Sequence, residues 1–195
     1  MRWIASFVLC LQLASGQAMP AALQRIRAKT PVDSVPHLEE RIAGHYVNPS
    51  KELIKQTGPA LAGENLYIFP DNSYVYCEWT DVMLNTVFDK GTWTLAGGIL
   101  VLRSDPEITW NPELERRFLA VRRVAHGDEV LLVGIEKSLP YFEKEAGSDP
   151  ELMLEIVGLQ REGSLSQAAS MELKAKLMRE AWRPEFFDQK PKNKN

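Results

Sequence analysis

The stretch that decides the fold is NLYIFPDNSYVYCEWTDVMLNTVFDKGTWTLAGGILVLRS, which runs from Asn65 to Ser104. It contains short runs of β-branched, aromatic and aliphatic residues, each bounded by residues that are typical of turns. The runs are Leu66–Phe69, Tyr74–Trp79, Thr92–Leu95 and Ile99–Leu102. Because the runs are short and closely spaced, they predict antiparallel strands arranged as a meander.

Turn residues separate these predicted strands. Pro70-Asp71-Asn72-Ser73 combines a proline, which presets φ, with Asp and Asn, which tolerate turn geometry. The pair Gly97-Gly98 can supply the positive φ angles of a tight two-residue hairpin. We also expect Gly91-Thr92-Trp93 to mark a point where the chain reverses.

Alternation along Tyr74–Trp79 assigns its side chains to two faces. The residues expected to face the core are Val75, Cys77 and Trp79. The residues expected on the opposite, wetter face are Tyr74, Tyr76 and Glu78. Cys77 is expected to be a small buried hydrophobic residue, because free cysteines are commonly buried.

Other segments extend the sheet. Gly44–Val47 is a predicted first strand, and Asn48–Gly63 is a predicted long, turn-rich connection. Phe118–Val124 and Glu129–Glu136 read as a second hairpin. The meander is expected to stop near Ile135, so both a small barrel and an open, curved sheet remain alternatives.

Helices are predicted on either side of these strands. Pro36–Ala43 can form two helical turns. Leu152, Ile156 and Leu159 follow at helical spacing after a helix start at Asp149-Pro150, although a strand over Leu152–Val157 is an alternative. Ser164 to Gln167 matches a capping box ahead of a long helix.

The predicted fold class is therefore mainly β with α. An antiparallel meander forms a small barrel or curved sheet, and short helices and a C-terminal helix pack on it. The predicted organisation is a signal peptide over residues 1–18, a flexible arm over 19–36, a β-rich domain over 37–163, a C-terminal helix over 164–184 and a disordered tail over 185–195.

The N-terminus indicates export. Met1-Arg2 is positively charged, Trp3–Ala14 is an apolar run too short to span a bilayer, and Ser15–Ala18 supplies small residues for cleavage. We expect a periplasmic or secreted protein with no stable membrane span after cleavage. Cys77 would then be the remaining cysteine, so an internal disulfide is excluded.

The composition is that of an ordinary globular protein, with 45% hydrophobic and 25% charged residues and a net charge of −3. Basic residues are scattered apart from Arg116, Arg117, Arg122 and Arg123. A mildly acidic chain without a basic face is a poor match to a phosphate backbone, so nucleic acid is not an expected partner.

The order of glycine, aromatic and aliphatic residues along the meander resembles that of a known family. Gly44-His45-Tyr46, Leu66–Tyr76, Gly91-Thr92-Trp93 and Gly98–Leu102 follow the order G-x-Y, L-x-L-x-x-D-G-x-Y, G-x-W and I-x-L. This order resembles that of small secreted bacterial domains, the lipocalin-like and related calycin-type barrels. The resemblance covers about residues 44–104 and implies that Trp93 packs across one end of a barrel. Asn72 and Ser73 stand where Asp-Gly is usual.

Motifs for chemistry are sparse. His37, His45 and His126 lie far apart and lack the spacing of a zinc site, and no phosphate-binding loop or Gly-x-Ser-x-Gly elbow occurs. No metal or cofactor is therefore expected. The carboxylates that could act as an acid and a base are Asp71, Glu78, Asp81 and Asp89, with solvated turn positions as the alternative.

The aromatic residues of the meander supply the candidate ligand-binding set: Tyr74, Tyr76, Trp79 and Trp93. They either fill a β core or line a pocket or exposed face. The first functional hypothesis is a non-enzymatic exported domain that binds a small apolar ligand or an envelope protein. The alternatives are an interaction module with a sealed core and an envelope hydrolase that uses meander carboxylates.

Overall fold

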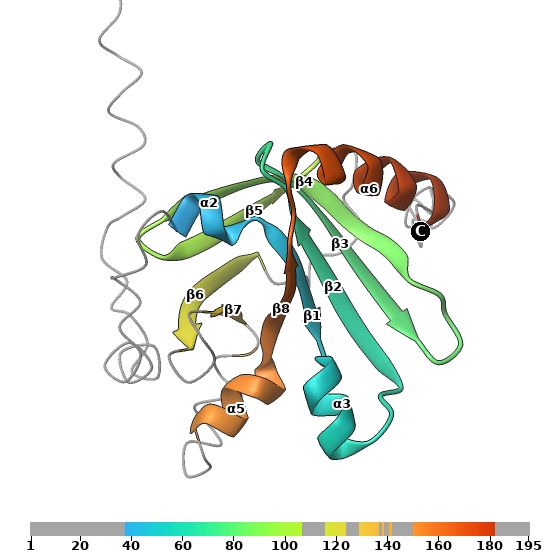
Figure 1. Ribbon diagram of the computed structural model, residues 1–195, viewed down its shortest axis with the longest axis vertical. Helices are drawn as coiled ribbons and strands as arrows, with labels where there is room; N and C mark the ends of the chain where they lie inside the picture. Colours follow the sequence, from blue (N-terminus) through green and yellow to red (C-terminus); the bar gives the residue numbers. More distant parts are fainter. Residues whose placement is uncertain are drawn as a thin grey trace, which may run out of the picture.

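A computed structural model describes residues 38–106, 116–123, 129–136, 138, 141 and 150–181. Within these residues, eight antiparallel strands follow one another around a closed barrel (Figure 1). The strands are β1 (Gly44–Asn48), β2 (Ala62–Ile68), β3 (Ser73–Thr80), β4 (Thr86–Ala96), β5 (Ile99–Ser104), β6 (Arg117–Arg123), β7 (Glu129–Gly134) and β8 (Gly158–Ser164). The predicted fold class is confirmed, and the barrel alternative is the one observed.

Helices surround the barrel (Figure 1). They are α2 (Leu38–Ile42), α3 (Lys51–Thr57), α5 (Pro150–Val157) and α6 (Gln167–Glu180). Helix α3 lies inside the segment predicted as a long connection, where the Ser50 side chain caps it by accepting a hydrogen bond from Leu53 N. Helices α2 and α6 lie at one end of the barrel, and α3 and α5 lie at the other.

Strand β8 closes the barrel by pairing with β7 on one side and β1 on the other. The sequence pattern missed this strand, because Leu159 was assigned to the preceding helix. The helix ends at Val157, and Leu159 lies on β8 in the barrel interior. Gly158 permits the change of direction: a Cβ there would come within 2.7 Å of both Leu131 Cδ1 and Leu154 O.

Large side chains fill the barrel interior. Members of this cluster include Tyr46, Tyr74, Tyr76, Phe88, Trp93 and Phe118. The expectation that Tyr74 and Tyr76 lie on a wetter face is wrong, since they are only 1% and 5% exposed. Val75 and Cys77 point outward and are covered by α6. Alternation alone could not separate the two faces, because both are buried.

Strand β4 runs straight through the point where Gly91-Thr92-Trp93 was expected to reverse the chain. Tyr76 pairs with Asp89 while Cys77 pairs with Val87, so β4 carries one extra residue there. Such a bulge bends and twists a strand without ending it. The reversals at Pro70–Ser73 and Gly97-Gly98 are confirmed, the latter with φ angles of 57° and 77°.

Two helices cover the outer wall. Leu177 and Ala181 of the α6 segment pack on Tyr67 and Val75, and the Val87 amide donates to Ala181 O at 2.9 Å. Met153 and Leu154 of α5 pack on outward-facing residues of β6 and β7. The cap of α6 is Ser166, whose hydroxyl accepts from Ala169 N, and not the predicted Ser164.

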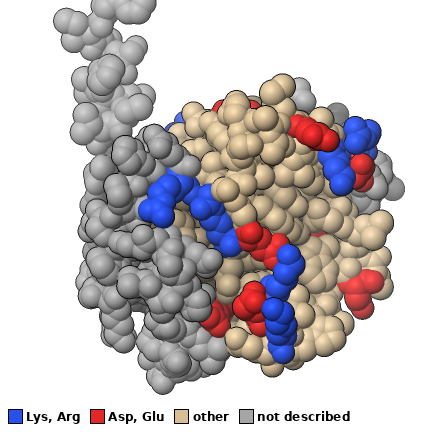
Figure 2. Space-filling view, viewed as in Figure 1, with Lys and Arg blue, Asp and Glu red and all other residues tan. Residues whose placement is uncertain are grey.

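Several expectations concern residues outside the described part of the chain. They are the signal peptide over 1–18, the arm over 19–36, the tail over 185–195, and His37 and His126. Among the described helices, none combines the length and the apolar character that a membrane crossing needs. On the face drawn in Figure 2, basic and acidic side chains are interspersed.

Candidate functional site

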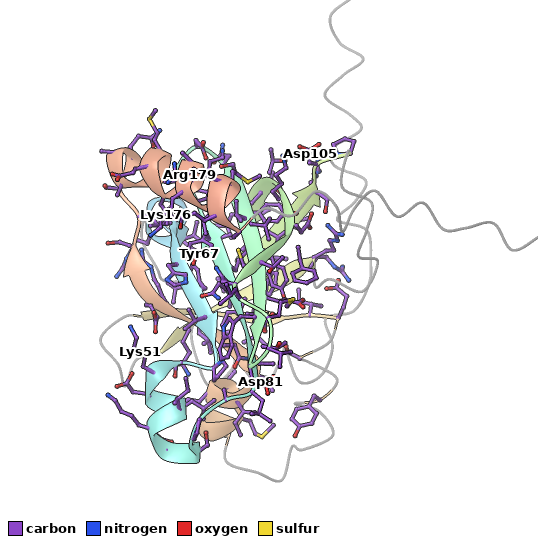
Figure 3. The ribbon with its side chains drawn as sticks, turned by 90° about the vertical axis from the view of Figure 1, so that its right-hand side faces the viewer. Lys51, Tyr67, Asp81, Asp105, Lys176 and Arg179 are labelled. Atoms are coloured by element: carbon purple, nitrogen blue, oxygen red, sulfur yellow. The ribbon has the colours of Figure 1, made fainter. Side chains whose placement is uncertain are left out.

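A pocket of about 340 Å³ opens where β1 ends, β2 begins and β3 ends; we call it the rim pocket. Its lining includes Asn48, Glu64, Tyr76, Glu78 and Trp79. It lies toward the end of the barrel that Lys51 and Asp81 mark in Figure 3. Residues from three adjacent strands, β1, β2 and β3, thus surround one concave surface.

Two carboxylates meet on one hydroxyl in the rim pocket. Glu64 and Glu78 are directly opposed in the register of β2 and β3. The Tyr76 hydroxyl lies 2.7 Å from Glu64 Oε2 and 3.1 Å from Glu78 Oε1. Like charges at opposed positions repel each other, so this pairing is unfavourable for the sheet by itself.

The environment of Tyr76 keeps its hydroxyl protonated. Burial, together with the negative charges of Glu64 and Glu78, raises the pKa of Tyr76 far above its ordinary value. The hydroxyl therefore acts as a hydrogen-bond donor and not as a base. It carries one proton and has a carboxylate oxygen on either side, so two carboxylates share one donor at this end of the barrel.

Trp79 forms an apolar wall of the same pocket. Its ring lies against Gly63, where a Cβ would come within 2.5 Å of the indole Cζ2 atom. The indole is partly exposed, unlike the aromatic residues of the interior. Gly63 therefore leaves room for the Trp79 ring at the rim.

Tyr74 belongs to a different polar cluster. Its hydroxyl donates to Asp89 Oδ2 at 2.7 Å, and the same oxygen accepts from Ser104 Oγ at 2.7 Å and from Arg116 Nη1 at 2.8 Å. Burial and the nearby Asp89 carboxylate raise the pKa of Tyr74, so this hydroxyl also stays protonated. Asp89 is 1% exposed, and its bonds tie β3, β4, β5 and the start of β6 together.

Trp93 lies in the interior, as its position in the Gly-x-Trp pattern implied. Its indole Nε1 donates to Phe69 O at 3.0 Å, at the turn between β2 and β3. Of the four predicted ligand-binding residues, the structure brings Tyr76 and Trp79 together in the rim pocket. Tyr74 and Trp93 lie elsewhere.

The remaining candidates for chemistry are dispersed. Asp71 accepts hydrogen bonds from the amide and hydroxyl of Ser73 in the β2–β3 turn, and Asp81 is exposed in the next loop. His45 stacks on Tyr67 outside the barrel, with ring centroids 4.4 Å apart, and burial lowers its pKa. Burial raises the pKa of the Cys77 thiol to about 12, so it is a poor nucleophile.

Sequence reasoning missed two members of these clusters, Glu64 and Arg116. Glu64 precedes Leu66 and Ile68 at a spacing of two, the period of one face of a strand, and this signal could have found it. Arg116 reaches Asp89 from 27 positions away, and nothing local to it predicts that contact. Among the described side chains, no group of three or more His, Cys, Asp or Glu could hold a metal ion.

The described residues thus form a closed, eight-stranded antiparallel β-barrel, which is consistent with a calycin-like architecture. Comparisons with protein-family models, curated proteins and solved structures found no match.

Proposed function

We propose that this chain is an exported, non-enzymatic binding protein whose rim pocket takes a small ligand with a positively charged group on an apolar body. The observation that carries the proposal is the convergence of Glu64 and Glu78 on the Tyr76 hydroxyl within a pocket. A protonated amine placed there has carboxylate oxygens from both glutamates as acceptors. Hydrogen bonds between ionised partners are stronger than those between neutral ones.

Trp79 supplies the second half of the recognition. Its partly exposed ring lines the rim pocket beside the two carboxylates. An aromatic face attracts a cation through its quadrupole and also packs against an apolar body. Pairing carboxylates with an indole therefore favours an organic ammonium ion over an uncharged apolar molecule.

Apolar side chains next to the pocket suit a ligand with an apolar body. Leu61, Val82 and Leu84 are 72%, 92% and 83% exposed, well above what is usual for large apolar residues. The Asp81 amide donates to Leu61 O at 2.8 Å, which holds the two loops together. Leu61 and Asp81 directly adjoin Ala62 and Thr80 of the pocket lining, so Leu61 and Val82 lie within two residues of that lining along the chain.

The resemblance to lipocalin-like domains supports a binding role but suggests a deeper site. Here the interior is occupied by large side chains, including Tyr46, Phe88 and Phe118. The ligand is therefore proposed to bind at the mouth of the barrel, with Tyr76 as its floor. The N-terminal pattern of Met1–Ala18 supports export to the periplasm or medium.

Calorimetric titration of the full chain at pH 7 tests the proposal with three probes of similar shape: phenethylamine, 2-phenylethanol and 3-phenylpropionate. We expect the amine to bind on the order of tenfold more tightly than the alcohol, the difference made by one charge-assisted hydrogen bond. Glu64→Gln and Glu78→Gln should each remove this preference. Glu52→Gln, on the exposed face of α3, should leave it unchanged.

Equal affinity for the amine and the alcohol would contradict a cationic ligand. Unchanged amine affinity in both glutamine variants would place any binding outside the rim pocket. If no probe binds, the filled interior favours the alternative, an interaction module with a sealed core.

A second candidate function is hydrolysis, and the same pair of carboxylates favours it. Glu64 and Glu78 both lie within hydrogen-bond distance of the Tyr76 hydroxyl in the rim pocket, and two neighbouring carboxyl groups serve as general acid and base in most glycoside hydrolases. Chromogenic glycoside and ester substrates test this candidate. Turnover that is lost in both Glu64→Gln and Glu78→Gln would support it, whereas equal turnover in the wild-type chain and both variants would exclude it.

A further inference from the structure

A second pocket, of about 450 Å³, lies on the outer wall of the barrel between α6 and strands β3, β4 and β5; we call it the wall pocket. Its charged and hydroxyl-bearing lining includes Ser73, Lys90, Thr92, Arg103, Ser104 and Lys174. Figure 3 places Asp105, another lining residue, at the α6 end of the barrel, away from Lys51 and Asp81. The wall pocket is thus distinct from the rim pocket.

The charge of the wall pocket is opposite to that of the rim pocket. Lys90, Arg103 and Lys174 come from three different elements and line it together, while Asp105 is its acidic lining residue. Three cations close together raise the local potential and attract an anion. No sequence pattern singles out these residues, because they lie on separate elements and become neighbours only in the folded barrel.

Two of the ion pairs that these cations form are partly exposed to solvent. Lys174 Nζ lies 3.3 Å from Asp71 Oδ2, and Lys90 Nζ lies 3.7 Å from Asp105 Oδ2, with all four side chains about a third exposed or more. Such exposed ion pairs contribute little to stability. Arg103 is exposed and forms no ion pair with any residue that the structure describes.

The hydroxyl groups of the pocket are largely committed to other acceptors. Ser104 Oγ donates to Asp89, and Ser73 Oγ donates to Asp71 at 2.5 Å while accepting from Lys174 at 2.8 Å. They therefore have no proton left for a bound anion. Recognition of an anionic group consequently depends on the three cations and on the exposed Thr92.

Part of the lining is apolar. Met178 and Pro106 contribute side chains, and Gly91 forms part of the lining without one. A Cβ at Gly91 would come within 2.0 Å of Arg103 O, so β4 and β5 approach each other closely here. The cations are thus accompanied by a surface against which an apolar body can pack.

We propose that the wall pocket binds a small organic anion, with a phosphate or carboxylate group held by Lys90, Arg103 and Lys174 and an apolar body packed against Met178 and Pro106. This site is independent of the rim pocket and of the function proposed for it. Lys174 and Met178 lie four positions apart and share one face of α6. The occupied pocket therefore fastens α6 to the barrel.

Titration calorimetry of the full chain with phenyl phosphate, benzoate and phenol tests this inference. We expect one or both anions to bind and phenol to bind on the order of tenfold or more weakly, as the loss of a charge-assisted hydrogen bond implies. The tighter of the two anions identifies the head group as phosphate or carboxylate. Bound anion should also raise the melting temperature, because ligands of the native state stabilise it.

Matched variants inside and outside the wall pocket locate the site. Arg103→Gln and Lys174→Gln should each weaken phenyl phosphate and benzoate on the order of tenfold. Lys176→Gln and Arg179→Gln remove cations that bond Glu180 and do not line the pocket, and should change neither affinity (Figure 3). Equal weakening by the two pairs of variants would overturn the inference in favour of a diffuse charge effect.

A local readout separates specific binding from general attraction. The Met178 methyl resonance should shift on saturation with phenyl phosphate, and inorganic phosphate should bind more weakly because it lacks the apolar body. An unshifted Met178 resonance at saturation would overturn the proposed location.

Equal affinity for inorganic and phenyl phosphate would overturn the role of the apolar wall. Glu78→Gln should leave phenyl phosphate binding unchanged, which distinguishes this site from the rim pocket.

Discussion

Arg116 Nη1 donates to Asp89 Oδ2 at 2.8 Å, and Asp89 is only 1% exposed. The same oxygen accepts the hydroxyl protons of Tyr74 and Ser104. One buried oxygen thus joins residues from β3, β4, β5 and the start of β6. These donors bond the carboxylate in place of water, so the stability of the fold depends on the carboxylate.

We expect Asp89→Ala to lower the free energy of unfolding by about 3–5 kcal/mol, because it leaves Arg116 and the Tyr74 hydroxyl without their acceptor. Urea denaturation followed by circular dichroism measures this loss. Asp81→Ala, at an exposed loop position, is the control and should have little effect. Adding Arg116→Met to Asp89→Ala should recover part of the loss. A loss below about 1 kcal/mol in Asp89→Ala would contradict a structural role for the cluster.

Much of the barrel could be predicted from residues 65–104, because several strand ends there carry turn residues whose chemistry is local. Gly97 and Gly98 adopt the positive φ angles that their residue type favours, and Trp93 is buried as its place in the Gly-x-Trp pattern implied. Closure could not be predicted in this way. Strand β8 begins directly after a helix, and its pairing with β1 and β7 is a long-range interaction that leaves only a weak pattern in the sequence.

The candidate site was predictable in part. Tyr76 and Trp79 were expected to contact a ligand and do line the rim pocket. Tyr76 was expected on the wetter face of β3 but points into the barrel interior. Helix α6 buries the outer side of β3, so alternation cannot show which of the two buried sides is the interior. Glu64 gains its significance only from the register that sets it opposite Glu78.

Gly91 is required because there is no room for a side chain at this position, and not because of its backbone conformation. A Cβ at this position would lie 2.0 Å from the Arg103 carbonyl oxygen, which is backbone and cannot rotate away. We expect Gly91→Ala to destabilise the chain by about 1–3 kcal/mol, as overpacking does. Gly163→Ala on β8, with no atom within 4 Å of the added Cβ, should be neutral or slightly stabilising. Equal melting temperatures for the two variants would contradict the close approach of β4 and β5.

Cys77 should be inert in the folded chain. It is fully buried beneath α6, and burial raises its pKa to about 12. At pH 8 the thiolate fraction is then roughly 10⁻⁴, far below that of an ordinary cysteine. We expect iodoacetamide at pH 8 to leave Cys77 unmodified under native conditions and to modify it fully in urea. Peptide mapping by mass spectrometry measures Cys77 separately from Cys10, and rapid native labelling of Cys77 would show that α6 does not protect it.

His45 should make stability depend on pH in a defined direction. Its ring stacks on Tyr67 and bonds Asn65, and burial lowers its pKa from about 6.5 despite the opposing charge of Glu162. The unfolded chain therefore binds a proton at His45 at higher pH than the folded chain does, and protonation favours unfolding. The contribution of neutral His45 is complete above about pH 6.5 and is lost progressively as pH falls below that value.

His45→Gln tests this dependence, because glutamine keeps a partner for Asn65 but does not titrate. Urea unfolding at pH 8.0 and pH 5.5 should show a larger fall in stability for the wild-type chain than for the variant. Comparing the two chains at each pH cancels the titration of other groups, including Glu162 and Lys51 near the ring. If Glu162 instead raised the pKa of His45 above its ordinary value, the wild-type chain would gain stability relative to the variant at pH 5.5. The sign of this difference therefore decides whether burial or the ion pair dominates at the outer face of β1.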